Sequence, residues 1–256
     1  MDLGLAGKVA LVTGGSRGIG RMIARGLAEE GSRVAICARG EDALRATAEQ
    51  LRSMGAEVLA VPADVTIEAG QRAVLDETLR TFGRLDVLVN NAGGGGAPTL
   101  METTDDQWQA AFDLTFWSSL RLSRMAVPPM REQGGGAIIM ISSIYGREQG
   151  GRPAYQTVKS AQISLAKAMA HELAPFNIRV NTVAPGSILF PGGSWDRRRH
   201  EDPEAMARFV ESDMPLGRFG RPDEVANVVL FLASERASLM VGACVNVDGG
   251  QSRSLI

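Results

Sequence analysis

Residues 8–20, KVALVTGGSRGIG, decide how this chain folds. Their first part, 9–12, is an apolar run with the length of a buried strand, and it is too short for a helix. Glycines then stand at positions 14, 18 and 20, and an amphipathic pattern typical of a helix follows. Free N–H groups and the dipole at a helix N-terminus attract phosphate, and glycines let the backbone approach it. The stretch therefore predicts a phosphate-binding turn, although a tight turn without a ligand can have the same composition.

The alternation of short apolar runs and amphipathic stretches continues along the whole chain. Strands are expected at 9–12, 33–37, 57–61, 85–89, 137–141, 178–183 and 243–247. Helical patterns fall at 19–30, 41–53, 67–81, 105–126, 155–174 and 222–233. This order predicts an α/β fold with a doubly wound, seven-stranded parallel sheet covered on both faces. No repeat or linker divides the chain, so residues 1–256 are expected to form a single domain whose ligand lies at the carboxyl ends of the strands.

Composition narrows the classes of function. The 256 residues carry a formal net charge of -2, which gives no general attraction to nucleic acid or acidic membranes. Cys37 and Cys244 lie in apolar runs and are expected to be small buried residues, and His171 and His200 offer no metal-ligand spacing. There is no run of about 18 apolar residues and no signal-peptide pattern. We expect a soluble, cytoplasmic protein without nucleic-acid, membrane or metal partners.

Three motifs together resemble those of the short-chain dehydrogenase/reductase family. They are T-G-x-x-x-G-x-G at 13–20, N-N-A-G at 90–93, and Y-x-x-x-K at 155–159 after a strand that ends in serine. The resemblance covers 8–250, almost the whole chain. It implies a Rossmann fold, a nicotinamide cofactor and the interconversion of a ketone and a secondary alcohol on a small molecule, as in 3-oxoacyl thioester reductases and sugar dehydrogenases. It also implies a homotetramer.

Within this resemblance, the residue after the second expected strand selects the cofactor. NAD-specific enzymes usually place a carboxylate there to bind the ribose hydroxyls, but this chain has Ala38 and Arg39. A guanidinium matches a 2′-phosphate in charge and geometry, and Arg17 in the glycine turn can reach the same group. The sequence favours NADP(H) over NAD(H), unless both arginines are solvated surface charges. Asp64 and Val65 are expected to contact the adenine, although Asp64 taken alone fits a helix cap better.

The resemblance assigns further residues to the cofactor. Asn91 is expected to tie neighbouring strands together, and the backbone at 92–93 to lie against the ribose. Residues 185–186 resemble the turn over the nicotinamide, with the backbone of Ile188 at the carboxamide. Relatives often carry a threonine where this chain has Phe190, so one diphosphate contact is missing. The full expected set is Gly14, Ser16, Arg17, Gly18, Ile19, Gly20, Arg39, Asp64, Val65, Asn91, Ala92, Gly93, Tyr155, Lys159, Pro185, Gly186 and Ile188.

Tyr155 and Lys159 are four residues apart and share one helix face. A free tyrosine titrates near pH 10, and lowering its pKa by about three requires roughly 4 kcal/mol of preference for the phenolate. A nearby ammonium in a partly dehydrated site can supply much of this preference. Such a pair alone also occurs on ordinary amphipathic helices. Together with the other motifs, it is expected to provide the acid and base, Tyr155, and the residue that activates it and binds the ribose, Lys159.

A serine is expected to polarise the substrate oxygen. A spacing of 13 residues before the tyrosine points to Ser142, whereas the I-S-S-x-x-G context points to Ser143. The context fits if the intervening glycine-rich loop is one residue shorter than in relatives, and we choose Ser143.

Two further features bear on function. The family has an asparagine seven residues after a tryptophan, where this chain has Thr115 after Trp108. Thr115 is expected to support the proton relay less well, which leaves open an alternative function, a nicotinamide-binding protein with weak or no catalysis. The segment near 187–215 is expected to be the lid that selects the substrate, with Trp195 able to cover a ring or chain. The basic run 197–200 can meet an acidic group, although such runs are more often solvated.

Overall fold

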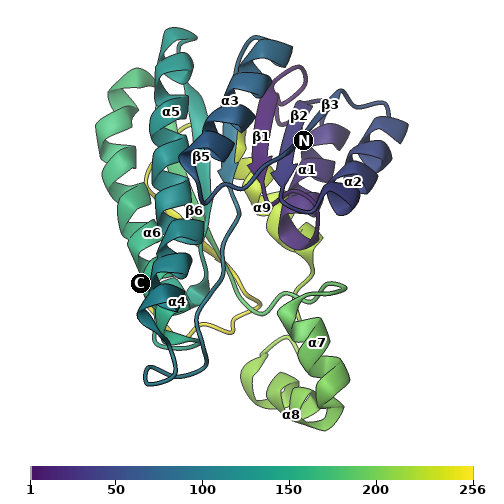
Figure 1. The fold of residues 1–256 in the computed structure, drawn as a ribbon, viewed down its shortest axis with the longest axis vertical. Helices are drawn as coiled ribbons and strands as arrows, with labels where there is room; N and C mark the ends of the chain where they lie inside the picture. Colours follow the sequence, from purple (N-terminus) through teal and green to yellow (C-terminus); the bar gives the residue numbers. More distant parts are fainter. Residues whose placement is uncertain (1, 256) are drawn as a thin grey trace.

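The computed structural model describes residues 2–255 and contains one seven-stranded sheet (Figure 1). The strands are parallel and lie in the order β3-β2-β1-β4-β5-β6-β7. Their bounds are β1 (Val9–Thr13), β2 (Arg33–Ala38), β3 (Val58–Pro62), β4 (Val87–Asn90), β5 (Gly136–Ile141), β6 (Ile178–Pro185) and β7 (Cys244–Val247). The doubly wound α/β fold expected from the sequence is confirmed. The strand order reverses between β1 and β4, which is where ligands bind in such sheets.

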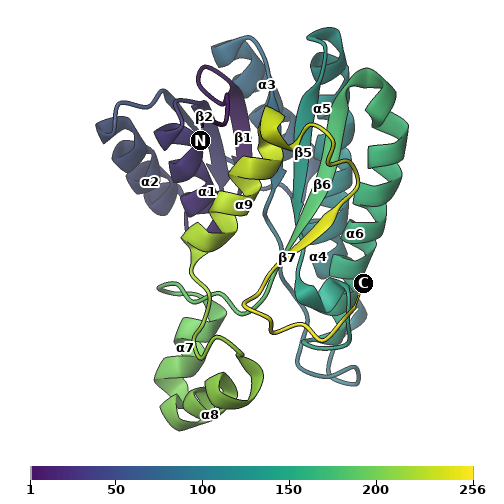
Figure 2. The same cartoon turned by 180° about the vertical axis from the view of Figure 1, so that it is seen from behind.

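Helices cover both faces of the sheet (Figures 1 and 2). One face carries α1 (Gly18–Glu29), α2 (Glu41–Ser53) and α9 (Pro222–Ala233), and the other carries α3 (Glu68–Phe82), α5 (Ser118–Glu132) and α6 (Pro153–Leu173). Successive strand residues point to opposite faces, so Ala10 packs in the first core and Leu11 in the second. Across residues 2–255, no helix combines the length and apolar composition that a membrane span requires.

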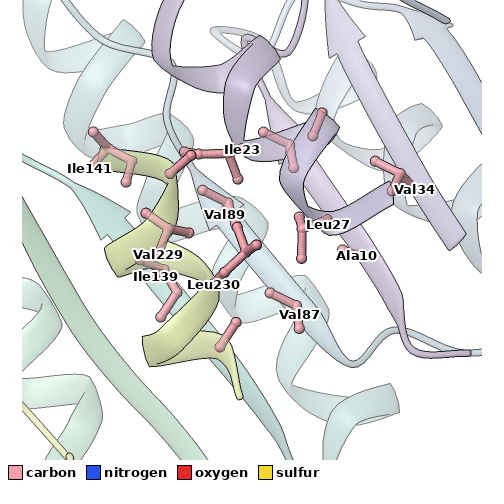
Figure 3. Packing of buried hydrophobic residues seen from close by; sticks show 14 of the residues in the cluster. Ala10, Ile23, Leu27, Val34, Val87, Val89, Ile139, Ile141, Val229 and Leu230 are labelled. Atoms are coloured by element: carbon pink, nitrogen blue, oxygen red, sulfur yellow. The ribbon is translucent and has the colours of Figure 1, made fainter. Parts of the chain in front are cut away.

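The core between α1, α9 and the sheet fixes the position of the glycine turn (Figure 3). Ile23 and Leu27 of α1 and Val229 of α9 are fully buried against Val89 and Ile139 of the sheet. Complete burial of an aliphatic side chain contributes about 1.5–3 kcal/mol. These contacts hold the N-terminal turn of α1 in place at the carboxyl edge of β1.

The helix expected at 105–126 is longer and less regular than its sequence predicts. It consists of α4 (Asp105–Ala111), the π-helical turn η1 (Phe112–Trp117) and α5, which ends at Glu132. Pro128 and Pro129 lie inside α5, where the sequence predicts an end because proline cannot donate to a helix carbonyl. The π-helical turn contains Thr115, which is fully buried. Such turns occur often at functional sites.

The segment between β6 and α9 protrudes from the carboxyl edge as two helices (Figure 1), which are α7 (Ser194–Glu201) and α8 (Pro203–Asp213). The two ends of the segment meet at its base through backbone hydrogen bonds. Leu189 donates one to Gly220 (2.9 Å), and Gly220 donates one to Ser187 (3.0 Å). We call residues 189–219 the lid segment. It overlaps residues 187–215, for which a role as substrate lid stays a prediction.

Candidate active site

The glycine turn joins β1 to α1, and its glycines are required by the local geometry. Gly14 and Gly18 have φ angles of 65° and 55°, in the left-handed region that favours glycine. A Cβ on Gly20 would clash with the carbonyl oxygen of Gly14. Arg17, the residue before α1, makes no side-chain hydrogen bond to the first turn of the helix. The N–H groups of this turn therefore have no side-chain cap, an arrangement that suits a bound phosphate.

Asn91 links the fourth strand to the glycine turn. Its Nδ2 donates hydrogen bonds to the carbonyl oxygens of Thr13 (2.9 Å) and Gly14 (3.2 Å). The hydroxyl oxygen of Thr13 in turn accepts from the N–H groups of Asn91 (3.0 Å) and Ala92 (3.1 Å). These bonds hold the glycine turn and the N-N-A-G segment side by side.

Two hydroxyl groups meet where β5 ends and α6 begins. Ser143 is buried and Tyr155 is partly buried, and the Ser143 hydroxyl lies close enough to act on the pKa of Tyr155. The Oγ of Ser143 also accepts a hydrogen bond from the N–H of Tyr145 at 3.2 Å. The Oγ of Ser142 instead donates to the carbonyl oxygen of Lys159 at 2.9 Å. The structure thus places Ser143 beside the tyrosine and Ser142 against the backbone of α6.

Lys159 lies next to Tyr155 on α6, with its Nζ 5.8 Å from the centroid of the tyrosine ring. The Nζ donates to the carbonyl oxygen of Ile141 (2.6 Å) and to Oε1 of Gln162 (3.2 Å). The residue is only 3% exposed, and this burial lowers the pKa of Lys159 from 10.5 to about 7. At neutral pH, only part of the Lys159 population is therefore charged.

The pKa of Tyr155 moves in the direction opposite to that expected from the sequence. Burial raises the pKa of Tyr155 above its ordinary value, while the hydroxyl of Ser143 acts to lower it and nearby Tyr145 acts to raise it. A full ammonium at the phenol oxygen would lower this pKa, but the Nζ of Lys159 bonds to two neutral oxygens and is partly deprotonated. In the protein by itself, Tyr155 keeps its proton at neutral pH.

Arg39 and Asp64 lie at the ends of the neighbouring strands β2 and β3. Arg39 is exposed, as is Arg17 before α1. The Oδ1 of Asp64 accepts from the backbone N–H (2.9 Å) and the hydroxyl (2.8 Å) of Thr66, which is the turn geometry that its sequence context allows. The Thr66 N–H lowers the pKa of Asp64, and the charge of Arg39 makes a smaller contribution in the same direction. Arg39 and Asp64 are therefore electrostatically coupled, and the buried Val65 follows directly.

The turn after β6 is held by residues near the C-terminus. Pro185 ends the strand, and a Cβ on Gly186 would lie 2.7 Å from Oε1 of Gln251. The same oxygen accepts from the N–H of Ser187 at 2.8 Å. Ile188 is buried and pairs with the base of the lid segment. Gln251 and the base of the lid segment thus hold in place the backbone that the sequence assigns to the nicotinamide.

Phe190, where the lid segment begins, packs its ring on the glycine turn. A Cβ on Gly18 would lie 2.7 Å from this ring. The ring also packs against Gly193, the residue before α7, where a Cβ would lie 3.0 Å away. Phe190 therefore connects the lid segment directly to the N-terminal end of α1.

The aromatic rings of the lid segment pack on one another. Trp195 stacks on Phe209 with ring centroids 4.7 Å apart, and Phe219 lies 5.4 Å from Trp195. Trp195 is thus engaged inside the lid segment, whereas the sequence suggests that it covers the substrate. The sequence could not predict this packing, because the three rings come from separate parts of the segment: α7, α8 and the base.

Most side chains of the basic run 197–200 contact other residues of α7. Arg198 lies over the ring of Trp195 at 4.9 Å. Arg199 and His200 both approach Asp196, at 3.1 and 3.7 Å. Arg197 and its neighbours 198–200 are exposed, which fits the solvated-face interpretation better than a dedicated anion site.

Comparison with known proteins identifies the family. A family model described as enoyl-(acyl carrier protein) reductase matches residues 14–252. The chain is also 39% identical over 245 residues to the 3-oxoacyl-acyl-carrier-protein reductase FabG of Staphylococcus aureus, covering 95% of this chain and 97% of that one. The chain belongs to the short-chain dehydrogenase/reductase family. The resemblance seen in the three sequence motifs is confirmed.

Solved structures of short-chain dehydrogenases/reductases share the fold. The L-sorbose reductase of Gluconobacter frateurii, in complex with NADPH and L-sorbose, is 39% identical with a TM-score of 0.94, covering 100% of both chains. A 7α-hydroxysteroid dehydrogenase in complex with NADH and 7-oxo glycochenodeoxycholic acid is 33% identical with a TM-score of 0.91, covering 100% of this chain and 98% of that one. The protein is thus an oxidoreductase of this family.

Gln162 is a buried polar residue of this short-chain dehydrogenase/reductase that the motifs do not single out. Gln162 is fully buried, and its Nε2 donates to Oγ of Ser119 at 2.9 Å. Thr115, at the position of the family asparagine, accepts through Oγ1 from the N–H of Gly94 (3.3 Å). One signal was available for Gln162, because it lies three residues after Lys159 and so on the same helix face.

Proposed function

We propose that this protein is a single-domain, NADP(H)-dependent oxidoreductase that interconverts a ketone and a secondary alcohol by hydride transfer. The observation that carries this proposal is that the hydroxyl of Ser143 lies close enough to Tyr155 to lower its pKa, with Lys159 beside the ring. Two hydroxyls at one point can both donate to a single carbonyl oxygen. The pair also lies at the sheet edge that carries the glycine turn, so a bound dinucleotide and a carbonyl group would share one site.

The glycine turn fits a dinucleotide. Gly20 leaves no room for a Cβ, and the first turn of α1 lacks a side-chain cap, so backbone N–H groups are available to a diphosphate. The chemistry that the cofactor supplies when bound is a hydride, given to the carbonyl carbon or taken from it. The residues proposed to hold it are Gly14, Ser16, Arg17, Gly18, Ile19, Gly20, Arg39, Asp64, Val65, Asn91, Ala92, Gly93, Tyr155, Lys159, Pro185, Gly186 and Ile188.

In the reduction, Tyr155 donates its phenolic proton to the substrate oxygen. Because burial raises the pKa of Tyr155, this proton is in place at neutral pH. Ser143 donates a hydrogen bond to the same oxygen and stabilises the negative charge that develops there. The charged form of Lys159 stabilises the phenolate that remains. In the oxidation, Tyr155 accepts the proton of the alcohol.

Two arginines support NADP(H) as the cofactor. β2 ends in Ala38, which offers no carboxylate to the ribose hydroxyls, and the exposed Arg39 follows it. Arg17, also exposed, stands at the start of α1. Related structures carry NADPH in L-sorbose reductase and NADH in the 7α-hydroxysteroid dehydrogenase. In this chain the guanidinium groups favour the cofactor with a 2′-phosphate.

The substrate is proposed to be a small ketone such as a ketose, or a 3-oxoacyl thioester, with the lid segment covering it. Named relatives include a 3-oxoacyl-acyl-carrier-protein reductase and an L-sorbose reductase. Each of these substrates presents a carbonyl oxygen to the Ser143–Tyr155 pair. Catalysis is favoured over a role in cofactor binding alone, because Thr115 keeps a hydroxyl close to the backbone around Gly93 and Lys159.

We also propose a cytoplasmic homotetramer. β7 is an edge strand of the sheet, and Leu239 and Val241 just before it are 96% and 38% exposed. Contact with a second copy would remove this apolar surface from water. Free thiols at Cys37 and Cys244 suit a reducing compartment. Light scattering after size-exclusion chromatography tests the assembly, and a monomeric mass contradicts it.

A substrate screen tests the activity. Purified protein is mixed with NADPH and a panel of ketoses, small ketones and 3-oxoacyl thioesters, and the loss of NADPH absorbance is followed. We expect at least one carbonyl compound to be reduced, and Tyr155→Phe to lose nearly all turnover while it still binds NADPH. Turnover retained by Tyr155→Phe would exclude the proposed proton donor.

A further inference from the structure

A chain of buried polar groups leads away from Lys159 into the protein. Gln162 and Ser119 are 0% and 1% exposed. Hydrogen bonds run from Nζ of Lys159 to Oε1 of Gln162 (3.2 Å), from Nε2 of Gln162 to Oγ of Ser119 (2.9 Å), and from Oγ of Ser119 to the carbonyl oxygen of Thr115 (2.7 Å). The chain thereby connects α6 to the π-helical turn η1.

This chain fixes the orientation of the Gln162 amide. The hydroxyl of Ser119 uses its one proton on the carbonyl oxygen of Thr115, so it can only accept from Gln162. The NH₂ group of Gln162 must therefore face Ser119, and its oxygen must face Lys159. An ammonium donates three hydrogen bonds and accepts none, so only this orientation of the amide can bind it.

Both hydrogen-bond acceptors of the Lys159 Nζ are neutral. Its bonds go to the oxygens of Ile141 on β5 and Gln162 on α6. Burial is the cause that lowers the pKa of Lys159 to about 7, and no charged side chain of residues 2–255 offsets it. The backbone of Gly93 and the titratable ring of Tyr155 also lie near it. Hydrogen bonds to a charged group are stronger than those between neutral groups, so each acceptor matters here.

We propose that Gln162 is a positioning residue: its amide oxygen, held in place by Ser119, fixes the Nζ of Lys159 beside Tyr155 and favours its charged form. The consequence for turnover rests on the proposed function. The charge of Lys159, however, is measurable without substrate or cofactor. The two ideas can therefore fail separately.

The first measurement is a titration of the lysine side chains. The chain has three lysines, Lys8, Lys159 and Lys167, so ¹³C-lysine labelling gives a spectrum with few ε-methylene signals. In Gln162→Leu, which keeps most of the volume but removes the acceptor, we expect the pKa of Lys159 to fall from about 7 by about one. The signals of Lys8 and Lys167 serve as internal references in the spectra of both proteins. An unchanged Lys159 curve in folded Gln162→Leu overturns the proposal.

The second measurement is the pH profile of kcat with the substrate found by the screen. Activity that needs the ammonium falls as the pH rises through the pKa of Lys159, so in Gln162→Leu this fall should move to lower pH. We expect kcat to be about tenfold lower than in the wild type at pH 8, with a smaller difference at pH 6. A merely structural role would lower kcat equally at both pH values. Gln162→Glu, which keeps an acceptor oxygen and adds a negative charge, should raise the pKa of Lys159 instead.

A further variant covers the case in which Gln162→Leu does not fold. Ser119→Ala leaves Gln162 in place but removes the group that holds its amide. The pKa of Lys159 should then fall by less than in Gln162→Leu, and no change in the Lys159 curve overturns the proposal. If no carbonyl compound is reduced at all, the proposed function fails, whereas the lysine titration still decides the role of Gln162.

Discussion

The sheet edge and the lid segment hold their side chains in different ways. By the sheet edge we mean the residues that follow β1, β2, β4 and β5, together with the start of α6. Here hydrogen bonds join separate elements: the bond from Asn91 to β1 is partly buried, and those from Ser142 to α6 and from Lys159 to β5 are buried. In the lid segment, Trp195 and Phe209 pack on each other, and most other side chains are exposed. The edge is part of the protein core, whereas the lid segment is held together by partly buried rings that pack on one another.

This difference separates two kinds of mutational effect. Removing one partner of a buried hydrogen bond leaves the other unsatisfied and costs about 1–3 kcal/mol. The lid segment protrudes from the rest of the chain (Figure 2), so a change inside it disturbs few other contacts. We expect substitutions at the sheet edge to change kcat, cofactor binding or global stability. Substitutions in the lid segment should mainly change KM.

The largest effect is expected for Lys159→Met at the sheet edge. The pKa of Lys159 is about 7 in the folded protein and 10.5 ordinarily, so between these values the unfolded chain binds more protons. Raising the pH through this window therefore stabilises the wild type, by about 3 kcal/mol between pH 7 and 9.5. Lys159→Met lacks this gain, and its kcat should fall at least about a hundredfold. Urea unfolding of both proteins at several pH values measures the stability difference.

Lys167→Met is the matched control for this experiment. Lys167 lies two turns further along α6, and its Nζ donates to the carbonyl oxygen of Gly242 on the protein surface. The stability of the Lys167→Met protein should change with pH in the same way as that of the wild type. A parallel pH dependence in Lys159→Met and the wild type would show that Lys159 is not held as a buried amine.

The next effect concerns Arg39. If Arg39 binds the 2′-phosphate, Arg39→Ala should weaken NADPH binding by about 10–100-fold and NADH binding by less than about twofold, because only NADPH carries that group. Calorimetric titration of both cofactors measures the two affinities. Arg72→Ala removes an exposed arginine of α3 that pairs with Glu68 and should change neither. Equal loss for NADPH and NADH would assign Arg39 to the surface and not to the site.

The sheet edge could be predicted from the sequence because its signals are local. Each strand is a short apolar run, and the geometry of the turn at 13–20 requires its glycines. The different positions of the Ser142 and Ser143 side chains needed the structure, since neighbouring residues at a strand end point to opposite sides. Gln162 also needed it, because its role depends on Ser119 of α5 lying opposite α6.

The lid segment could be predicted only as a long insertion. α7 has the sequence SWDRRRHE, which has no apolar face, so no helical period is visible. Its one large apolar residue, Trp195, packs on Phe209 and Phe219 from other parts of the segment. Likewise, the residues of η1, FDLTFW, carry no pattern that distinguishes a π-helical turn from an α-helix. Contacts between distant residues decided both features.

Phe190 is where the two regions touch, and changing it should have a moderate effect. Its ring packs on Gly18 at the N-terminal end of α1, where the diphosphate is proposed to bind. Phe190→Thr is smaller and adds a hydroxyl donor, so NADPH should bind about 3–10-fold tighter. Calorimetric titration of the free protein measures this. Weaker binding in Phe190→Thr would mean that the ring forms part of the cofactor site instead of obstructing it.

The smallest effect is expected for Trp195→Ala in the lid segment. Loss of the stack on Phe209 should loosen α7 and α8 and accelerate amide exchange there, because aromatic pairs contribute about 0.5–1.5 kcal/mol beyond their burial. Since the ring packs inside the segment, KM for the best substrate should rise no more than about threefold, with kcat unchanged. Leu216→Ala, an exposed lid residue, controls for surface changes and should leave amide exchange as it is. A rise in KM of more than about tenfold, or an unfolding temperature lowered as by a core substitution, would show that the lid segment is built into the site as firmly as the sheet edge.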